Sequence, residues 1–354
     1  MKSILYISLF LAFMGCNEFE EEIDLSSSND IAQKYLDINL DSTIYYANKT
    51  LENATSEHER YYAHYLIAYA YDEKQKYLNS VQHYLLALKE IPKDDSYNKK
   101  RVSLNKNLGR IAEVQKDYNS ALKFYDIALK YANDQSIAGV LYNKGFALKE
   151  LGKYEDAIRV FKEAHEYAVE NRNSLRQSRI TNVIGVIFTR LGDQNEARNY
   201  FWSIINSQKF KGYEESAGIA YQNIAHSYLL EEDYINAVCF LNQAESIETE
   251  IDKFITYMDL GNCYMYLKEF EKSESYLISA KKLYSLVEKT PENILLFRSL
   301  ENLYRELDEN SKRNLYSDKY NVEIDAYFSL SRKVIDHNSL TKFRIFLNNY
   351  FEKE

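Results

Sequence analysis

The sequence predicts an all-α protein in which pairs of helices repeat along the chain, and three observations lead to this. Only 2 prolines and 10 glycines occur in 354 residues, too few for the many tight turns of a strand-rich protein. One stripe recurs: an aromatic residue, a small residue three later, a large apolar residue four further on and a small residue after three more, as on one helix face. Hydrophobic residues make up 45% of the chain, which excludes a disordered protein.

The first element is an N-terminal export signal. Lys2 precedes an apolar stretch, Ile4–Met14, which is too short to span a membrane because a spanning helix needs about 20 apolar residues. Residues 1–15 therefore have the proportions of a cleaved signal peptide. Phe13–Cys16 resembles a bacterial lipobox, loosely at its first two positions and strictly at its last two. The resemblance implies acylation of Cys16; the alternative is an ordinary signal peptide with an incidental cysteine.

The second element is the acidic, polar segment that follows. Residues 16–34 begin with Cys16 and a cluster of glutamates, and this composition predicts a flexible tether. Acyl chains on Cys16 would hold the protein at a membrane surface. We therefore expect a lipid-anchored protein of the bacterial cell envelope, at the outer membrane, on its periplasmic or surface face.

The third element is the repeat itself. Six segments carry the stripe: Tyr77–Ala87, Tyr118–Ala128, Tyr154–Ala164, Gln194–Ile204, Tyr234–Ala244 and Phe270–Ala280. A small residue lies at a matching place in the helix that precedes five of them: Gly109, Gly145, Gly185, Ala225 and Gly261. Repetition of this kind is the signature of a stacked helical array.

These units resemble the tetratricopeptide repeat, a helix–turn–helix unit, over most of the chain after the signal. The resemblance implies a right-handed superhelical solenoid, in which paired helices approach closely at the small residues and aromatic rings fill the space beside them. Gly152 and Gly192 fall at the turns within two units, where a positive φ is easily accommodated. The units repeat at intervals longer than those of the family, which predicts longer helices or links.

The predicted array spans residues 35–330. Six units are clear, near 61–94, 102–135, 138–171, 178–211, 218–251 and 254–287. A degenerate half-unit near 39–54 precedes them, and a degenerate full unit near 294–327 follows. Residues 331–354 carry an apolar pattern that predicts a final helix, and we expect this helix to cap the end of the array.

Composition and motifs argue against nucleic-acid binding and catalysis. The formal net charge is −9, and no basic run provides the surface that phosphate binding needs. The chain lacks the common motifs of zinc proteases, serine hydrolases and nucleotide-binding proteins, and its six histidines are scattered. Cys239 and Cys263 show no metal-ligand spacing, so we expect two small buried residues, with a disulfide as the alternative. We expect no cofactor, no metal and no small-molecule substrate.

The family resemblance implies a concave groove lined by the first helix of each unit. Carried onto this sequence, the groove positions give Lys106, Arg110, Tyr142, Asn143, Phe146, Arg179, Asn182, Arg190, Gln222, Asn223, His226, Asn262, Arg298 and Asn302. Three of these, Lys106, Asn143 and Arg179, match the family's clamp for a C-terminal carboxylate, whereas Arg110 and Val183 depart from it. The groove is thus mildly basic on an acidic protein, which suits acidic or C-terminal peptide segments.

The leading hypothesis is therefore a non-catalytic, lipid-anchored adaptor that binds a protein or peptide in its groove. An alternative is an envelope sensor, because the chain also resembles the exported part of regulators in which a repeat array precedes a membrane helix and a DNA-binding domain. No apolar segment long enough for that helix follows the repeats. A carbohydrate-binding lipoprotein is disfavoured, because Trp202 is the single tryptophan.

Overall fold

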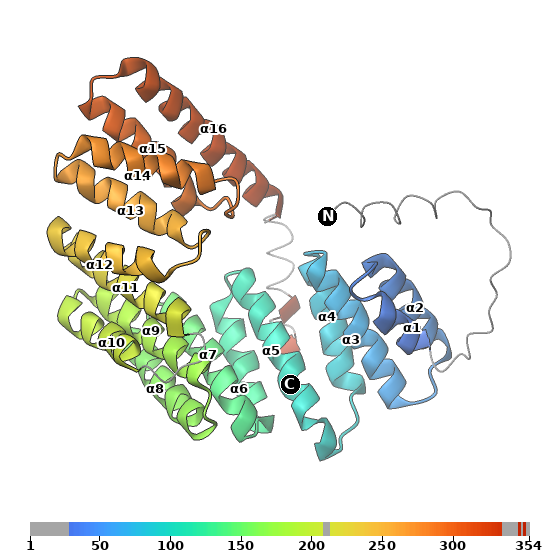
Figure 1. Ribbon diagram of the computed structural model, residues 1–354. Coiled ribbons are helices and arrows are strands. Elements are labelled where there is room, and N and C mark those ends of the chain that lie inside the picture. Colours follow the sequence, from blue (N-terminus) through green and yellow to red (C-terminus); the bar gives the residue numbers. More distant parts are fainter. Residues whose placement is uncertain (1–27, 208–212, 335–345, 348–349, 352–354) are drawn as a thin grey trace, which may run out of the picture.

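The computed structural model describes residues 28–207, 213–334, 346–347 and 350–351, and every regular element in these ranges is helical. The α-helices are α1 Ser28–Tyr35, α2 Leu40–Asn53, α3 Glu57–Glu73, α4 Tyr77–Glu90, α5 Asn98–Val114, α6 Tyr118–Tyr131, α7 Asp134–Glu150, α8 Tyr154–Glu170, α9 Ser174–Leu191, α10 Gln194–Asn206, α11 Tyr213–Leu230, α12 Tyr234–Ile247, α13 Lys253–Tyr266, α14 Phe270–Leu283, α15 Pro291–Glu306 and α16 Asn310–Val334. They stack in chain order along a curved array (Figure 1). The predicted all-α repeat fold is confirmed.

The helices pack in pairs through the predicted stripe. From α3 onward, each odd-numbered helix packs most closely against the even-numbered helix after it. A Cβ at Gly109 would lie 2.4 Å from the ring of Tyr125, and one at Gly145 would lie 2.8 Å from the ring of Phe161. Gly185 with Phe201 and Gly261 with Leu277 repeat this contact. The first helix therefore needs a small residue there, because the partner side chain occupies the space of a methyl group.

From α3 onward, the turn inside each pair contains a residue with positive φ. Gly152 and Gly192 hold this place in α7–α8 and α9–α10, with φ of 73° and 85°. Non-glycine residues hold it in the other pairs from α3 onward: Gln75, Lys116, Glu232, Lys268 and Asp308. The next backbone N–H then donates back to the first helix, as from Lys153 to the Leu148 carbonyl at 3.0 Å. This geometry ends each first helix and reverses the chain.

The odd-numbered helices form the inner side of the curve. Helix α5 also contacts α7, α9 contacts α11, and α13 contacts α15. Even-numbered helices of neighbouring pairs have no comparable contact in the described part of the chain. Helices on the inner side of a curved stack lie closer together than those on the outer side. The faces of α5, α7, α9, α11 and α13 that do not pack on a partner helix therefore point to the concave side of the array.

Two junctions between pairs are thinner than the rest. The links 91–97, after α4, and 284–290, after α14, are long, and α4–α5 and α14–α15 pack less closely than the other junctions. The two prolines of the chain lie at these places: Pro92 inside the first link and Pro291 at the start of α15. Proline ends a helix and disfavours helical geometry in the residue before it.

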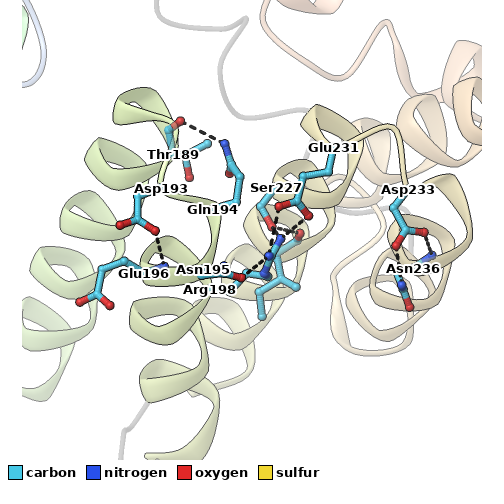
Figure 2. Close-up of polar contacts among 11 residues, drawn as sticks. Thr189, Asp193, Gln194, Asn195, Glu196, Arg198, Ser227, Glu231, Asp233 and Asn236 are labelled. Atoms are coloured by element: carbon cyan, nitrogen blue, oxygen red, sulfur yellow. Dashed lines mark hydrogen bonds and ion pairs between the residues drawn. The ribbon is translucent and has the colours of Figure 1, made fainter.

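A polar contact supports one of the tighter junctions (Figure 2). Arg198 of α10 donates to Glu231, the residue that follows α11, at 2.8 Å and to the Ser227 hydroxyl of α11 at 3.2 Å. Its guanidinium also lies over the ring of Tyr228, 4.5 Å from the centroid. Because this arginine is held on three sides, it fixes the position of α11 and of the groove residues that α11 carries.

The N-terminal boundaries differ from the prediction. The tether expected over 16–34 is wrong from Ser28 onward, because Ser28–Tyr35 forms α1 and buries Ala32. Helices α1 and α2 therefore make a full pair where a half-unit over 39–54 was expected. Asn39 caps α2 by accepting hydrogen bonds from the Asp41 and Ser42 amides. Residues 1–27, with the signal peptide and Cys16, lie outside the described residues.

The C-terminal boundary differs as well. Helix α16 continues to Val334, so 331–334 belong to the last pair and do not begin a separate cap. The residues further on that are described, Phe346, Leu347, Tyr350 and Phe351, pack in the core cluster of α4, α5 and α6. An end-capping helix over 331–354 is therefore wrong for these residues. No helix in the described ranges has the length and apolar character needed to cross a membrane.

Candidate protein-binding groove

The residues predicted to line a groove all lie on the inner, odd-numbered helices. Helix α5 carries Lys106 and Arg110, α7 carries Tyr142, Asn143 and Phe146, and α9 carries Arg179, Asn182 and Arg190. Helix α11 carries Gln222, Asn223 and His226, α13 carries Asn262, and α15 carries Arg298 and Asn302. The contacts of each side chain decide which of them can meet a ligand.

Tyr142 and Phe146 form an apolar centre on α7. Their ring centroids are 5.2 Å apart, and both side chains are half-buried. They line a cavity of about 320 Å³ together with Arg179 and Asn182 of α9 and Ile219 of α11. A cavity of this size can hold one or two side chains of a bound segment, with polar groups at its edge.

Arg176 and Arg179 of α9 lie near Tyr142, and Lys106 of α5 lies near Arg176. Burial lowers the pKa of Lys106, and the nearby positive charge of Arg176 lowers it further. Burial raises the pKa of Tyr142, while the charges of Arg179 and Arg176 act in the opposite direction. Arg176 reaches this place over Gly139, where an ideal Cβ would lie 3.3 Å from its Nη1 atom. None of the three cations forms an ion pair with another described residue, so an anionic group from outside can meet them.

Sequence reasoning missed Arg176. It lies in the first turn of α9, one helical turn before Arg179, in the part by which this helix extends beyond the family's unit. The absence of a side chain at Gly139 was the available signal, because a glycine inside α7 leaves room for a long neighbouring side chain.

Further along the array, polar side chains form hydrogen bonds between successive inner helices. Asn223 Nδ2 donates to Asn182 Oδ1 at 2.7 Å, which joins α11 to α9. Gln222 Nε2 donates to Thr256 Oγ1 at 3.0 Å, and Thr256 donates to Glu248 Oε2 at 2.8 Å. These amides keep part of their hydrogen-bonding capacity, because each has more donor and acceptor sites than these bonds use.

Some predicted groove residues have their charge satisfied within the protein. Arg110 forms an ion pair with the buried Asp72 of α3, and Arg298 pairs with Glu301 at 2.7 Å. Val183 is buried in the core beside α7 and α8. The clamp pattern that the sequence suggested is thus incomplete at two positions, and Arg176 adds a cation that the pattern did not contain.

The remaining predicted residues lie on the same helices with fewer contacts. Asn143 and Asn262 are half-buried, and Arg190 and His226 are exposed. Asn302 accepts a hydrogen bond from Arg305 at 3.0 Å. Nothing in the geometry gives these residues more than a supporting part at the surface of the groove.

Titratable clusters elsewhere show no sign of a metal site. No group of three or more potential ligands occurs in the described ranges. His64 and His83, which looked unrelated in the sequence, lie with their Nδ1 atoms 3.1 Å apart. Burial lowers the pKa of His64, and burial together with His64 lowers the pKa of His83 to about 4. Both rings are therefore neutral near pH 7 and serve the packing of α3 on α4.

The cysteines differ in part from the prediction. Cys263 is buried on α13 as expected, but Cys239 is exposed on α12, and both are free. A helix pair buries only the stripe of α12 that faces α11, which includes Ala237 and Leu241. Cys239 lies two residues from each of them and so falls outside that stripe.

Comparison with known proteins places the repeat in a family. The tetratricopeptide repeat model matches residues 136–202, which run from α7 through most of α10 and include the aromatic centre and both arginines. This part of the chain is a tetratricopeptide repeat segment, and the helix pairs on both sides of it continue the same fold. No curated protein sequence matches it significantly.

Solved structures share the fold of this chain at low sequence identity. The apo form of RapI is 12% identical, with a TM-score of 0.58, over 92% of this chain and 98% of RapI. A tetratricopeptide repeat protein from Parabacteroides merdae is 18% identical, with a TM-score of 0.50, over 75% of this chain and 93% of its own. Tetratricopeptide repeat arrays are in general non-catalytic scaffolds that bind protein or peptide partners.

Proposed function

We propose that this protein is an adaptor of the bacterial cell envelope that binds an acidic peptide segment on its inner face. The observation that carries the proposal is a group of three cations beside the 320 Å³ cavity that Tyr142 and Arg179 line. Arg176 and Arg179 lie near Tyr142, and Lys106 lies near Arg176. Carboxylates of the segment would meet the cations, and an apolar side chain would enter the cavity beside Phe146. The amides of Asn182 and Gln222 would bind its backbone.

The charge of this site gives the proposal a direct test. We expect short acidic peptides, each made with a free and an amidated C-terminus, to bind the full chain with an affinity that falls as salt rises. Replacing Arg176 and Arg179 by Glu should weaken binding at least about tenfold, because losing charged contacts at a binding site costs 2 kcal/mol or more. Fluorescence anisotropy at two salt concentrations measures both effects.

Lys162→Glu is the control, because Lys162 is exposed on the outer helix α8 and the substitution changes the charge in the same way. A peptide affinity that changes neither with salt concentration nor on replacing the two arginines would contradict the proposed site. A preference for the free C-terminus would point to a terminal carboxylate, and equal binding of both forms to internal acidic side chains.

Attachment to the outer membrane through Cys16 is the second part of the proposal. It is supported by the apolar stretch and by Gly15-Cys16. Cells that express the chain should incorporate a labelled fatty acid into it, and Cys16→Ala should abolish the label and release the protein from membranes, since acyl chains supply the affinity. Equal labelling of both forms would refute the lipid anchor. The alternative of a sensor that works with a separate membrane partner rests on the same inner face.

A further inference from the structure

A second interaction surface lies against α4, α5 and α6. It holds four described residues from the end of the chain, Phe346, Leu347, Tyr350 and Phe351, here called the C-terminal contact residues. Figure 1 shows them beside α5, a helix that lies far from them in the sequence. Leu347 is completely buried there, so this is a packed contact and not a surface encounter.

The contact is built around Phe124 of α6. The ring centroid of Phe351 lies 4.8 Å from that of Phe124, and the ring of Tyr350 stacks on it at 6.3 Å. The ammonium group of Lys123 lies 4.5 Å from the centroid of Phe351. Phe124 is completely buried, whereas Phe240, at the same place in the stripe of α12, is only partly buried. The C-terminal contact residues thus cover a ring that the array alone leaves open.

The thin α4–α5 junction explains why this surface exists. The link that contains Pro92 separates α4 from α5, so α5 does not close the space between α4 and α6. A groove remains whose apolar wall includes Leu85 and Leu88 of α4 and Ile127 of α6. An opening of this kind accepts a helix laid across it.

The C-terminal contact residues fill the groove only in part. A cavity of about 1030 Å³ remains beside Phe346 and Tyr350, and Leu86 and Asn105 also line it. Asn105 is 1% exposed, yet its Oδ1 atom accepts no hydrogen bond from the described residues. A buried acceptor without a donor costs free energy. A helix that donated a hydrogen bond to Asn105 would therefore fit this groove better than the C-terminal contact residues do.

We propose that this groove is a docking site for a short aromatic helix, and that the chain's own C-terminal contact residues occupy it as a detachable plug. Positions 346, 347, 350 and 351 share one face of a helix, since residues three and four apart are neighbours. A segment that belongs to the same chain competes at a high effective concentration. The groove therefore opens to a partner helix only when the plug is released. This regulation is separate from peptide binding on the inner face.

The test uses a labelled peptide of residues 341–354 and the full chain. In Leu347→Asp the plug loses its buried residue, and the free groove should bind the peptide at least about tenfold more tightly than the wild type does, because the wild-type groove is already filled. Adding Leu86→Asp to this variant should abolish binding. Adding Val169→Asp, on an exposed position of α8, should not. Circular dichroism checks that each variant is folded.

Three results would overturn the proposal. The peptide could bind neither form, which would make the segment a fixed part of the array. It could bind both forms equally, which would mean that the groove is not occupied. The wild type could be a dimer that Leu347→Asp dissociates, which would place the segment of a second copy in the groove. A photo-crosslinker at Tyr350 gives an independent readout on an otherwise unchanged chain: we expect intramolecular products with α4 or α6, and products confined to α15 and α16 would contradict the docking.

Discussion

At the scale of single residues, Gly145 shows how the absence of one methyl group sets the distance between two helices. A Cβ there would lie 2.8 Å from the ring of Phe161. We expect Gly145→Ala to lower the free energy of unfolding by about 1–3 kcal/mol, because the overlap forces the core apart. The gain of about 1 kcal/mol in helix propensity from alanine opposes this only in part. Urea unfolding followed by circular dichroism measures the difference.

Gly139→Ala in the same helix provides the matched comparison. Its new Cβ would meet only the far end of the flexible Arg176 side chain, at 3.3 Å, so the propensity gain should leave stability unchanged or slightly higher. If both variants lost the same stability, tight packing of Phe161 would not be the reason for the glycine.

The sequence predicted the groove residues unevenly at this scale. The repeat spacing indicated which side of the helix Tyr142, Phe146 and Arg179 face, and these three residues line the 320 Å³ cavity. It could not show that Arg110 is paired with Asp72, since that contact depends on the relative placement of two pairs. Arg176 was missed because it lies outside the repeating positions.

At the scale of helices and turns, five of the turns within pairs hold a non-glycine residue in the left-handed region. Lys268, with φ of 60°, ends the turn between α13 and α14. We expect Lys268→Gly to raise the free energy of unfolding by about 0.5–1 kcal/mol, because glycine adopts this conformation without the steric cost that a side chain brings. Thermal or urea unfolding tests it. Lys268→Ala keeps a Cβ and should stay close to the wild type; a similar gain in both would rule out backbone strain as the cause.

The sequence predicted most helices but missed some of their ends. Helix α1 was missed because its eight residues bury only Asn29 and Ala32, too few positions to show a period. The turns were predicted only where glycine marks them, at Gly152 and Gly192. Elsewhere the backbone hydrogen bonds of the turn impose the same conformation on Lys116 or Glu232. The residue types at these positions do not predict a positive φ.

At the scale of the whole molecule, the repeat predicted the array because each pair contacts mainly its neighbours. For this reason the stacking order can be predicted from the sequence, whereas contacts between distant parts of the chain cannot. The aromatic pattern near the C-terminus suggested an apolar helical face, but it could not show that Leu347 packs against α4–α6. An end cap was the natural inference from position along the chain, and the structure places these residues elsewhere.

The two thin junctions give the molecule an uneven stiffness. Between α5 and α14 each pair is packed firmly on the next, so this middle part resists bending as a single body. At α4–α5 and α14–α15 fewer side chains interlock, and the array has softer joints there. The C-terminal contact residues lie across the first joint and brace it. Among the described residues, the last two helices are held through the second joint. A load on the ends of the array would therefore bend it first at the joint that follows α14.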